Sequence, residues 1–356
     1  MRLSTSSFST RKPGKIHIAL VLALCVLLCI SVELVTTRYF VRVSRTEKRR
    51  EAEYRAALAM RSAKGDNKLG VLLLGNSILL RGVDFPELQR DLGPDVQVTR
   101  TVFENTSFLD WFYGLRQFFR AGSRPDVVVL VLSPWQLVSD ATDGDYAVQM
   151  LVDRRDLLRF AKETGADRNA ISVMALAKAS FFFGTRAEIR TWILNTILPD
   201  LPELTRYFRF DVSAKDDPHF TEIAAKRLNR LRELCAQYGA TFVLVVPPAR
   251  EDTGLKAIVD AAAAQGVPAL VPMRVLPGSD YADLIHLNAH GAATFTPVLA
   301  DSLRQTLATL PPETPVRTSA PAPQGKTIES GARRGAPAQR ADAAAGRQVL
   351  SAGFLK

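Results

Sequence analysis

Short apolar runs alternate with amphipathic stretches along the middle of the chain, between residues 69 and 310. The apolar runs are rich in valine and leucine and are bounded by glycine, proline or aspartate, as buried strands commonly are. They predict strands at 71–74, 96–103, 126–132, 241–246 and 269–271. The stretches between them predict helices at 107–121, 218–238, 253–265 and 289–308. This alternation predicts an α/β domain with a doubly wound parallel sheet, and five strands suit the flavodoxin-like order.

A long apolar run near the N-terminus predicts a membrane anchor. Residues 1–15 are polar and basic, and the run at 16–37 is long enough to span a bilayer when its polar end reaches the interface. A cleaved signal peptide is the alternative, but no small-x-small cleavage site follows the run. Both flanks are basic, so the positive-inside rule does not decide the orientation.

Three further segments depart from the α/β pattern. Residues 38–68 are highly charged and predict a solvated juxtamembrane helix that lifts the domain off the bilayer. Residues 140–216 exceed what a crossover between two strands needs, and they predict a helical insertion. The insertion is either an ordinary cap that buries its own aromatic residues, or a lid or docking subdomain that exposes phenylalanines 181–183. Residues 311–356 are rich in Pro, Ala, Gly and Arg and predict a disordered tail.

The distribution of charge argues against nucleic-acid binding. The formal net charge of the chain is +10. Residues 1–15, 38–50 and 311–356 carry +4, +5 and +4, which leaves about −2 for 51–310 once Glu33 is counted. The basic residues therefore belong to the chain ends and the flanks of the apolar run, and no basic face is expected on the α/β domain.

The first predicted strand ends in a motif that places a serine at the edge of the sheet. The sequence from Gly70 to Ser77 is a run of valine and leucine closed by glycine, asparagine and serine. Glycine and asparagine favour a turn, so Ser77 is expected at the carboxyl end of the strand, where open α/β sheets bind ligands. The following helix would direct backbone amides at anything bound beside the hydroxyl. Taken alone, a serine here is a turn residue or helix cap.

A partner for this serine lies some two hundred residues later, in the sequence Asp283-Leu-Ile-His286, just before the last helix. This spacing lets Asp283 hold one imidazole nitrogen of His286 while the other nitrogen faces outward. Two other histidines have simpler explanations. His290 is badly spaced from Asp283, and His219 is explained by a helix start with Asp217 as cap and Pro218 in the first turn.

The glycine-asparagine-serine and Asp-x-x-His motifs together resemble the SGNH/GDSL hydrolase superfamily, over roughly residues 69–310. The family's first block is Gly-Asp-Ser, and this chain has Asn76 in place of the aspartate. The family's oxyanion glycine has no counterpart at 104–107, and its Gly-x-Asn block falls on a serine-proline-tryptophan-glutamine sequence ending at Gln136. The resemblance leaves Asn76, Asn105 and Gln136 as candidate side-chain donors to an oxyanion. The backbone amide of Ser77 needs no particular side chain.

The resemblance implies ester chemistry at the cell envelope. The departures of this chain from the family motifs are of the kind seen in membrane-anchored members that act in cell-surface polysaccharide acylation. It implies a serine esterase or O-acyltransferase with Ser77, His286 and Asp283 as the triad, acting on an acyl ester, most simply acetyl, of an envelope polysaccharide. It also implies a cytoplasmic N-terminus, a periplasmic or extracytoplasmic domain and a multi-spanning membrane acyltransferase as partner. No cofactor is implied, and no pair of His or Cys in the domain has metal-ligand spacing.

Two other interpretations stay open at this point. The weak middle motifs favour a catalytically inactive relative, an anchored scaffold that binds polysaccharide or a protein partner through the same groove. A flavodoxin-like nucleotide-binding domain would share the predicted fold, but the sequence has no glycine-rich phosphate loop.

Overall fold

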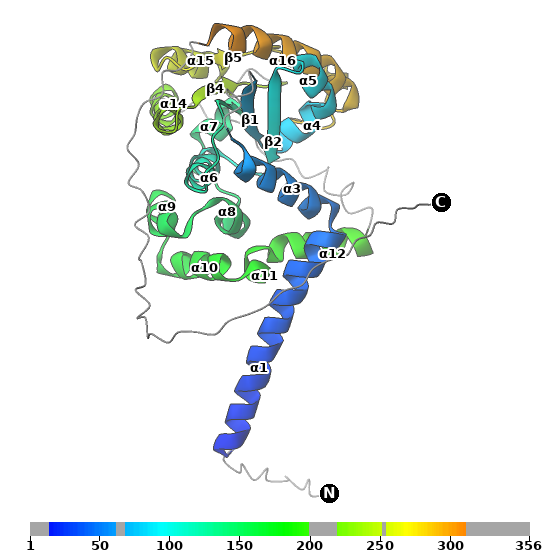
Figure 1. Cartoon of the computed structure of the whole chain (residues 1–356), viewed down its shortest axis with the longest axis vertical. Helices are drawn as coiled ribbons and strands as arrows, with labels where there is room; N and C mark the ends of the chain where they lie inside the picture. Colours follow the sequence, from blue (N-terminus) through cyan, green and yellow to red (C-terminus); the bar gives the residue numbers. More distant parts are fainter. Residues whose placement is uncertain (1–13, 62–67, 199–218, 251–253, 311–356) are drawn as a thin grey trace, which may run out of the picture. The chain divides into compact units, whose positions relative to one another are not determined.

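A computed structural model describes residues 14–61, 68–198, 219–250 and 254–310 (Figure 1). Its centre is one sheet of five strands: β1 (Leu69–Gly75), β2 (Val96–Val102), β3 (Val127–Val131), β4 (Thr241–Val245) and β5 (Ala269–Leu270). The order is β2-β1-β3-β4-β5, and every pair is parallel. The prediction of a doubly wound α/β fold with the flavodoxin-like strand order is therefore confirmed.

Helices cover both faces of the sheet, because its strands are apolar on both sides. In β1, Leu72 and Leu74 join one buried cluster, while Val71 and Leu73 join the other. The first cluster is closed by α6 (Phe108–Arg120), α14 (Phe220–Gln237) and α15 (Leu255–Ala264). The second is closed by α4 (Ser77–Gly82), α5 (Phe85–Leu92) and α16 (Ala289–Thr309). Alternate residues of each strand thus enter different cores, as the two-residue repeat of a strand requires.

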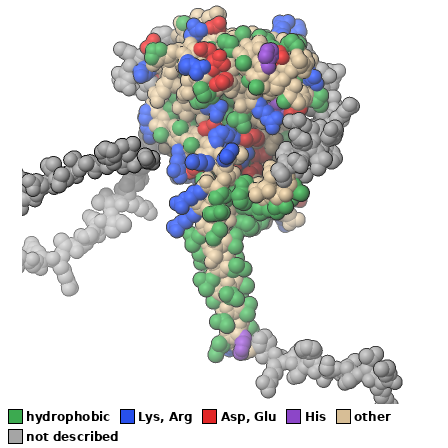
Figure 2. Space-filling model, turned by 90° about the vertical axis from the view of Figure 1, so that its right-hand side faces the viewer, with side chains coloured by type: hydrophobic (Ala, Val, Ile, Leu, Met, Phe, Trp, Pro, Cys, Tyr) green, Lys and Arg blue, Asp and Glu red, His purple; other side chains and the backbone are tan. Residues whose placement is uncertain are grey.

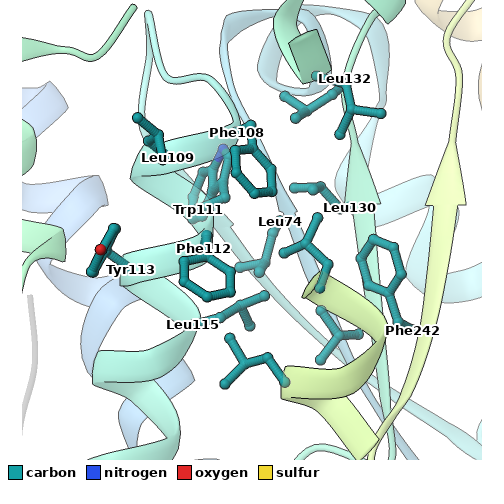
Figure 3. Close-up of a cluster of buried hydrophobic side chains, with 14 of the residues drawn as sticks. Leu74, Phe108, Leu109, Trp111, Phe112, Tyr113, Leu115, Leu130, Leu132 and Phe242 are labelled. Atoms are coloured by element: carbon teal, nitrogen blue, oxygen red, sulfur yellow. The ribbon is translucent and has the colours of Figure 1, made fainter. Parts of the chain in front are cut away.

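Aromatic side chains of α6 fill the larger core. Figure 3 shows Phe108 and Trp111 facing the strand residues Leu74 and Leu130. Phe108 and Trp111 have no exposed surface, and the Phe108 and Phe112 rings stack with centroids 5.8 Å apart. A buried aromatic residue contributes a few kcal/mol through the area it removes from water, so α6 fixes the position of the loop that leads from β2 into it.

The helix predicted as a solvated juxtamembrane spacer at 38–68 packs against the domain, which corrects the expectation that it is solvated. Helix α3 (Arg45–Ala59) packs along β2 and α6, and Ala57 is fully buried. Glu53 accepts hydrogen bonds from the Arg100 side chain and from the Val102 amide. Part of the charge of this helix therefore meets partners on the sheet, whereas Arg55 on its other side is exposed. Residues 62–67 lie outside the described residues.

The segment between β3 and β4 is helical, as expected of the insertion. After α7 (Pro134–Val138) it contains α8 (Gly144–Leu151), α9 (Leu157–Glu163), α10 (Arg168–Ala179), α11 (Phe181–Gly184) and α12 (Arg186–Ile197). Helices α8 and α9 bury Tyr146 and Phe160 against the domain. Phe181 and Phe183 are partly buried, whereas Phe182 is exposed. The insertion therefore buries aromatic residues in its first half and exposes apolar ones later, and its last residues, 199–216, lie outside the described part.

The chain enters the domain through one long apolar helix. Helix α1 (Lys15–Val35) has no buried residue and continues through a π-helical turn, η1 (Thr36–Phe40), into α2 (Val41–Val43). By length and composition α1 could cross a membrane, and a signal sequence would meet the same criterion. The predicted basic segment before Gly14 and the predicted tail at 311–356 lie outside the described residues.

Three buried carboxyl groups lie between α6 and the insertion. Burial raises the pKa of Asp110 to about 7, although backbone amides donate to it. Burial raises the pKa of Asp143 to about 8, and the charges of Glu188 and Asp110 add to this effect. Burial also raises the pKa of Glu188 to about 6. The low-dielectric surroundings thus favour the neutral acid at all three positions.

We expect the stability of the domain to fall as pH rises from about 4 to 8. In this range the unfolded chain ionises these carboxyls while the folded chain holds their protons, so the folded state binds more protons. In Asp143→Asn, the fall in melting temperature between these two pH values should be smaller than in the wild type by roughly 5–10 °C. Asp95→Asn, at an exposed position, is the control and should keep the wild-type slope. Parallel curves for Asp143→Asn and wild type would contradict the assignment.

Candidate active site

A tight turn after β1 positions Ser77. A Cβ atom on Gly75 would lie 2.8 Å from the Leu79 Cβ and 3.0 Å from the Val131 carbonyl oxygen, so only glycine allows this approach. Asn76 caps α4: its Oδ1 accepts from the Ile78 amide at 3.0 Å, and its Nδ2 donates to the Thr106 carbonyl at 3.0 Å. Ser77 is therefore the first residue of α4, at the carboxyl edge of the sheet. The close turn at Gly75 and the hydrogen bonds of Asn76 fix its position.

A small hairpin before α16 positions the histidine and the aspartate. Tyr281 and Leu287 form an antiparallel bridge, and the Ala282 amide donates to the His286 carbonyl at 2.8 Å. Inside the hairpin, Asp283 Oδ1 accepts from the amides of Ile285 at 3.0 Å and His286 at 2.8 Å. This local turn fixes the carboxylate beside the imidazole ring, which is why a spacing of three residues suffices.

The hairpin and the start of α4 meet, although they are separated by about two hundred residues. His286 Nε2 lies 2.8 Å from Ser77 Oγ. His286 Nδ1 lies 2.8 Å from Asp283 Oδ2 and 3.0 Å from Oδ1. The hydroxyl, the imidazole and the carboxylate stand in one hydrogen-bonded series. This is the geometry of a Ser-His-Asp triad.

Several solved hydrolases and esterases are similar to this chain at low scores. One is LAE5, an α/β hydrolase enzyme from the metagenome of Lake Arreo, Spain, with a TM-score of 0.35, 14% identity and coverage of 68% of this chain and 98% of that one. Another is an Axe2 variant, an acetyl-xylooligosaccharide esterase from Geobacillus Stearmophilus, with a TM-score of 0.33, 11% identity and coverage of 66% and 92%. A third is the acetyl xylan esterase Est2A from the rumen bacterium Butyrivibrio proteoclasticus, with a TM-score of 0.33, 10% identity and coverage of 67% and 64%.

No protein-family model and no curated protein matches the chain. Because the TM-scores and identities of the solved structures are low, they carry no argument about its activity. The chemical interpretation therefore rests on the geometry of the site itself.

The hairpin keeps Asp283 ionised. Its burial raises the pKa, but hydrogen bonds from the Ile285 amide and from the ring and amide of His286 outweigh that effect and lower the pKa below its usual value. Arg81 Nη1 lies 3.8 Å from Asp283 Oδ2, with 56% of its side chain exposed. At that distance and exposure the arginine contributes little, and the negative charge beside the imidazole depends on the hairpin.

The three side chains predicted as oxyanion donors all lie beyond the carboxyl ends of the strands. Asn76 is fully buried and makes its hydrogen bonds to the backbone. Gln136 is buried in the cap of α7, where its Oε1 accepts from the Ser133 amide at 3.0 Å and the Ser133 hydroxyl at 2.9 Å. Asn105 is exposed in the loop after β2. Their role as donors stays a prediction, whereas the Ser77 amide lies in the first turn of α4, where amides have no partner within the helix.

The remaining histidines lie outside the triad. His290 is 79% exposed and its Nδ1 lies 2.8 Å from Asp280 Oδ1. His219 is also exposed, and the predicted cap residues at 217 and 218 lie outside the described residues. Cys235 is buried in α14, as expected of a core residue. Within the described ranges, no group of three His, Cys, Asp or Glu side chains could hold a metal ion.

Sequence reasoning missed the contacts that support the loop beside the serine. Arg49 and Arg50 of α3 pair with Glu104 at 2.6 Å each, two residues before the Thr106 carbonyl that holds Asn76. Nothing local in the sequence connects these residues. Arg81 could have been found, because it lies four residues after Ser77 on a predicted helix and so shares its face.

Asn105 offers a test of the oxyanion donors. Its φ of 59° is left-handed, a conformation that asparagine and glycine tolerate and other residues resist. Asn105→Gly keeps this backbone and removes only the side-chain amide. If the amide stabilises an oxyanion, kcat should fall about 10²–10³-fold; if the backbone amide of Ser77 is the main donor, as we expect, kcat should change by less than about threefold. Asn105→Ala, measured in parallel, should cost about 1 kcal/mol of stability.

Proposed function

We propose that this chain is a serine esterase or O-acyltransferase that works through an acyl-Ser77 intermediate. The observation that carries the proposal is the 2.8 Å approach of His286 Nε2 to Ser77 Oγ, with His286 Nδ1 held by Asp283. A serine hydroxyl is a weak nucleophile alone, and an adjacent imidazole oriented by a carboxylate is what activates it.

The reaction has two halves. Ser77 Oγ attacks the ester carbonyl while His286 Nε2 takes its proton, and the negative oxygen formed is stabilised by the Ser77 amide at the start of α4. His286 then gives the proton to the leaving alcohol, and the acyl group remains on Ser77. An incoming hydroxyl, from water or from a sugar, gives its proton to His286 as its oxygen attacks the acyl carbonyl. The bond from the acyl carbon to Ser77 Oγ then breaks, and His286 returns the proton to Ser77 Oγ. Asp283 stabilises the imidazolium in both halves.

The substrate class follows from the sequence resemblance: an acyl ester, most simply acetyl, of an envelope polysaccharide. On this proposal α1 is an uncleaved anchor in the inner membrane, and the domain is periplasmic or extracytoplasmic. A multi-spanning membrane acyltransferase would then supply the acyl group. The proposal is supported by α1, which is apolar over most of its length and has no buried residue.

A fluorophosphonate probe tests the nucleophile directly. The full chain in detergent should be labelled on Ser77, and Ser77→Ala should abolish the labelling because it removes the hydroxyl that His286 activates. Ser172→Ala, at an exposed serine of α10, is the matched control and should be labelled like the wild type. Absence of labelling in a folded wild-type protein would reject the proposal.

One observation favours a second candidate, a non-catalytic scaffold that binds polysaccharide. One of the three predicted oxyanion side chains, Asn76, already donates its NH2 group to the Thr106 carbonyl. If the Ser77 amide alone is too weak a donor, the groove would bind acylated sugar without turning it over. Binding of an acetylated oligosaccharide together with failure to label Ser77 would identify this role.

A further inference from the structure

The later helices of the insertion carry an apolar surface. Outside α1, most exposed large apolar side chains of the described residues lie between 173 and 198. We call them the apolar platform: Val173, Leu176, Phe182, Ile193, Leu194, Ile197 and Leu198. Contiguous exposed apolar surface on a folded domain usually marks an interaction site.

The platform residues share helix faces. Val173 and Leu176 are three residues apart on α10, and the next residue, Ala177, is buried. Ile193, Leu194 and Ile197 follow the same three- and four-residue spacing on α12, and Ile197 is 69% exposed. Each helix therefore turns an apolar stripe outward, which is the reverse of what a helix on a water-exposed surface does.

Hydrogen bonds and a ring contact attach the platform to the end of α1. The carboxylate of Glu33 accepts from the Ser180 hydroxyl at 2.7 Å and from the Phe181 amide at 2.6 Å, and so caps α11. The rings of Phe40 in η1 and Trp192 in α12 meet edge to face, 5.9 Å apart. The platform thus begins where the apolar stretch of α1 ends, and Figure 2 shows hydrophobic side chains continuing from α1 onto the adjoining part of the domain.

Basic side chains stand beside this junction. Arg38, Arg42 and Arg45 are exposed between the end of α1 and the start of α3, and Arg190 is exposed on α12. Figure 2 shows Lys and Arg side chains next to the upper end of α1. Cationic side chains at this level suit the anionic headgroups of a phospholipid bilayer, and apolar stripes beneath them suit its acyl chains.

We propose that the apolar platform rests in the interface of the same bilayer that α1 spans. This inference rests on the proposed anchoring of the chain and assigns the exposed face of α10 and α12 to lipid. The bilayer is favoured over a protein partner because the platform is continuous with α1, whose side chains are mostly apolar and exposed. The domain is then held at two places, so its orientation to the membrane is fixed.

A fixed orientation has a consequence for the site. Helix α3 follows the anchor directly, and its Arg49 and Arg50 hold Glu104 in the loop that supports Asn76 and Ser77. These ion pairs connect the carboxyl edge of the sheet to α3, which on this proposal is the helix nearest the membrane. Acyl donors or acceptors held at the membrane surface would meet Ser77 in a constant geometry.

Spin-label accessibility in lipid nanodiscs tests the platform in the full chain. Labels are placed through Leu176→Cys, Ile197→Cys, Leu24→Cys in α1 and Val275→Cys, in a Cys25→Ser, Cys29→Ser background; Cys235 is buried and stays. Val275 is the matched control, with 59% exposure against 69% for Ile197. Labels at 176, 197 and 24 should collide several-fold more with oxygen than with a water-soluble nickel chelate, and the label at 275 should show the reverse.

Each outcome decides the inference. Chelate-dominated collisions at 176 and 197, with a lipid signal at 24, would overturn the platform and leave the anchor standing. Shielding of 176 and 197 from both reagents would overturn it in favour of a protein partner. Loss of the segment that carries position 24 would reject the anchor and the platform together. Unchanged melting temperatures of the variants show that they fold, and fluorophosphonate labelling of Ser77 reports on the proposed chemistry independently.

Discussion

Asp283→Asn should lower kcat/KM for a small acetyl ester by about 10⁴-fold while leaving the fold intact. In the hairpin, Asp283 Oδ1 accepts from the amides of Ile285 and His286. An asparagine would keep its carbonyl oxygen on these amides and turn its NH2 group toward His286 Nδ1. The ring would then carry its hydrogen on Nε2, facing the serine as a donor, and could not take the proton from Ser77.

Two controls separate this effect from a general loss of charge. Arg81→Gln removes the other charged group near Asp283, but at 3.8 Å and 56% exposure it should change kcat/KM by only a few-fold. The melting temperature of Asp283→Asn should stay close to that of the wild type, because the backbone amides keep an acceptor. An Asp283→Asn protein with wild-type activity would mean that the carboxylate does not orient His286.

The sheet could be predicted because its information is local. Runs such as that of β3 (Val127–Val131) are apolar on both faces. In a globular domain this pattern is typical of a parallel strand that is buried on both sides. The meeting of Ser77 with His286 could be expected for a related reason. One residue closes the first strand and the other precedes the last helix, and parallel strands bring such ends to one edge. Their chemical role stays a proposal.

The predictions that failed or stay open involve two kinds of residue. Some have partners far away in the sequence, and others have side chains that can serve either as oxyanion donors or as helix caps. The charges of α3 indicated solvation because the sequence does not show that Glu53 meets Arg100. Asn76 and Gln136 have the side-chain chemistry of oxyanion donors, but the same chemistry caps a helix. The sequence contains these amide groups, but it does not show which partners their oxygen and nitrogen atoms meet.

Arg50→Met should destabilise the domain by about 3–5 kcal/mol and lower its melting temperature by roughly 10 °C. Arg50 is buried, pairs with Glu47 at 2.8 Å and Glu104 at 2.6 Å, and lies 4.6 Å from the centre of the Tyr146 ring. Without the guanidinium, the buried Glu47 carboxylate loses its cation, and Glu104 keeps only Arg49 as a partner. The loss should appear in thermal unfolding followed by circular dichroism.

The control for this prediction lies on the same helix. Arg55 is 75% exposed and pairs with Glu51 across one helical turn, so Arg55→Met should cost less than about 1 kcal/mol. If both variants melt alike, α3 is only an external spacer. If only Arg50→Met is destabilised, the helix that leads from the anchor is part of the core that supports the Ser77 loop. The site and the N-terminal helices are then coupled through Glu104, and Arg50→Met should also lower fluorophosphonate labelling of Ser77 below the temperature at which the domain unfolds.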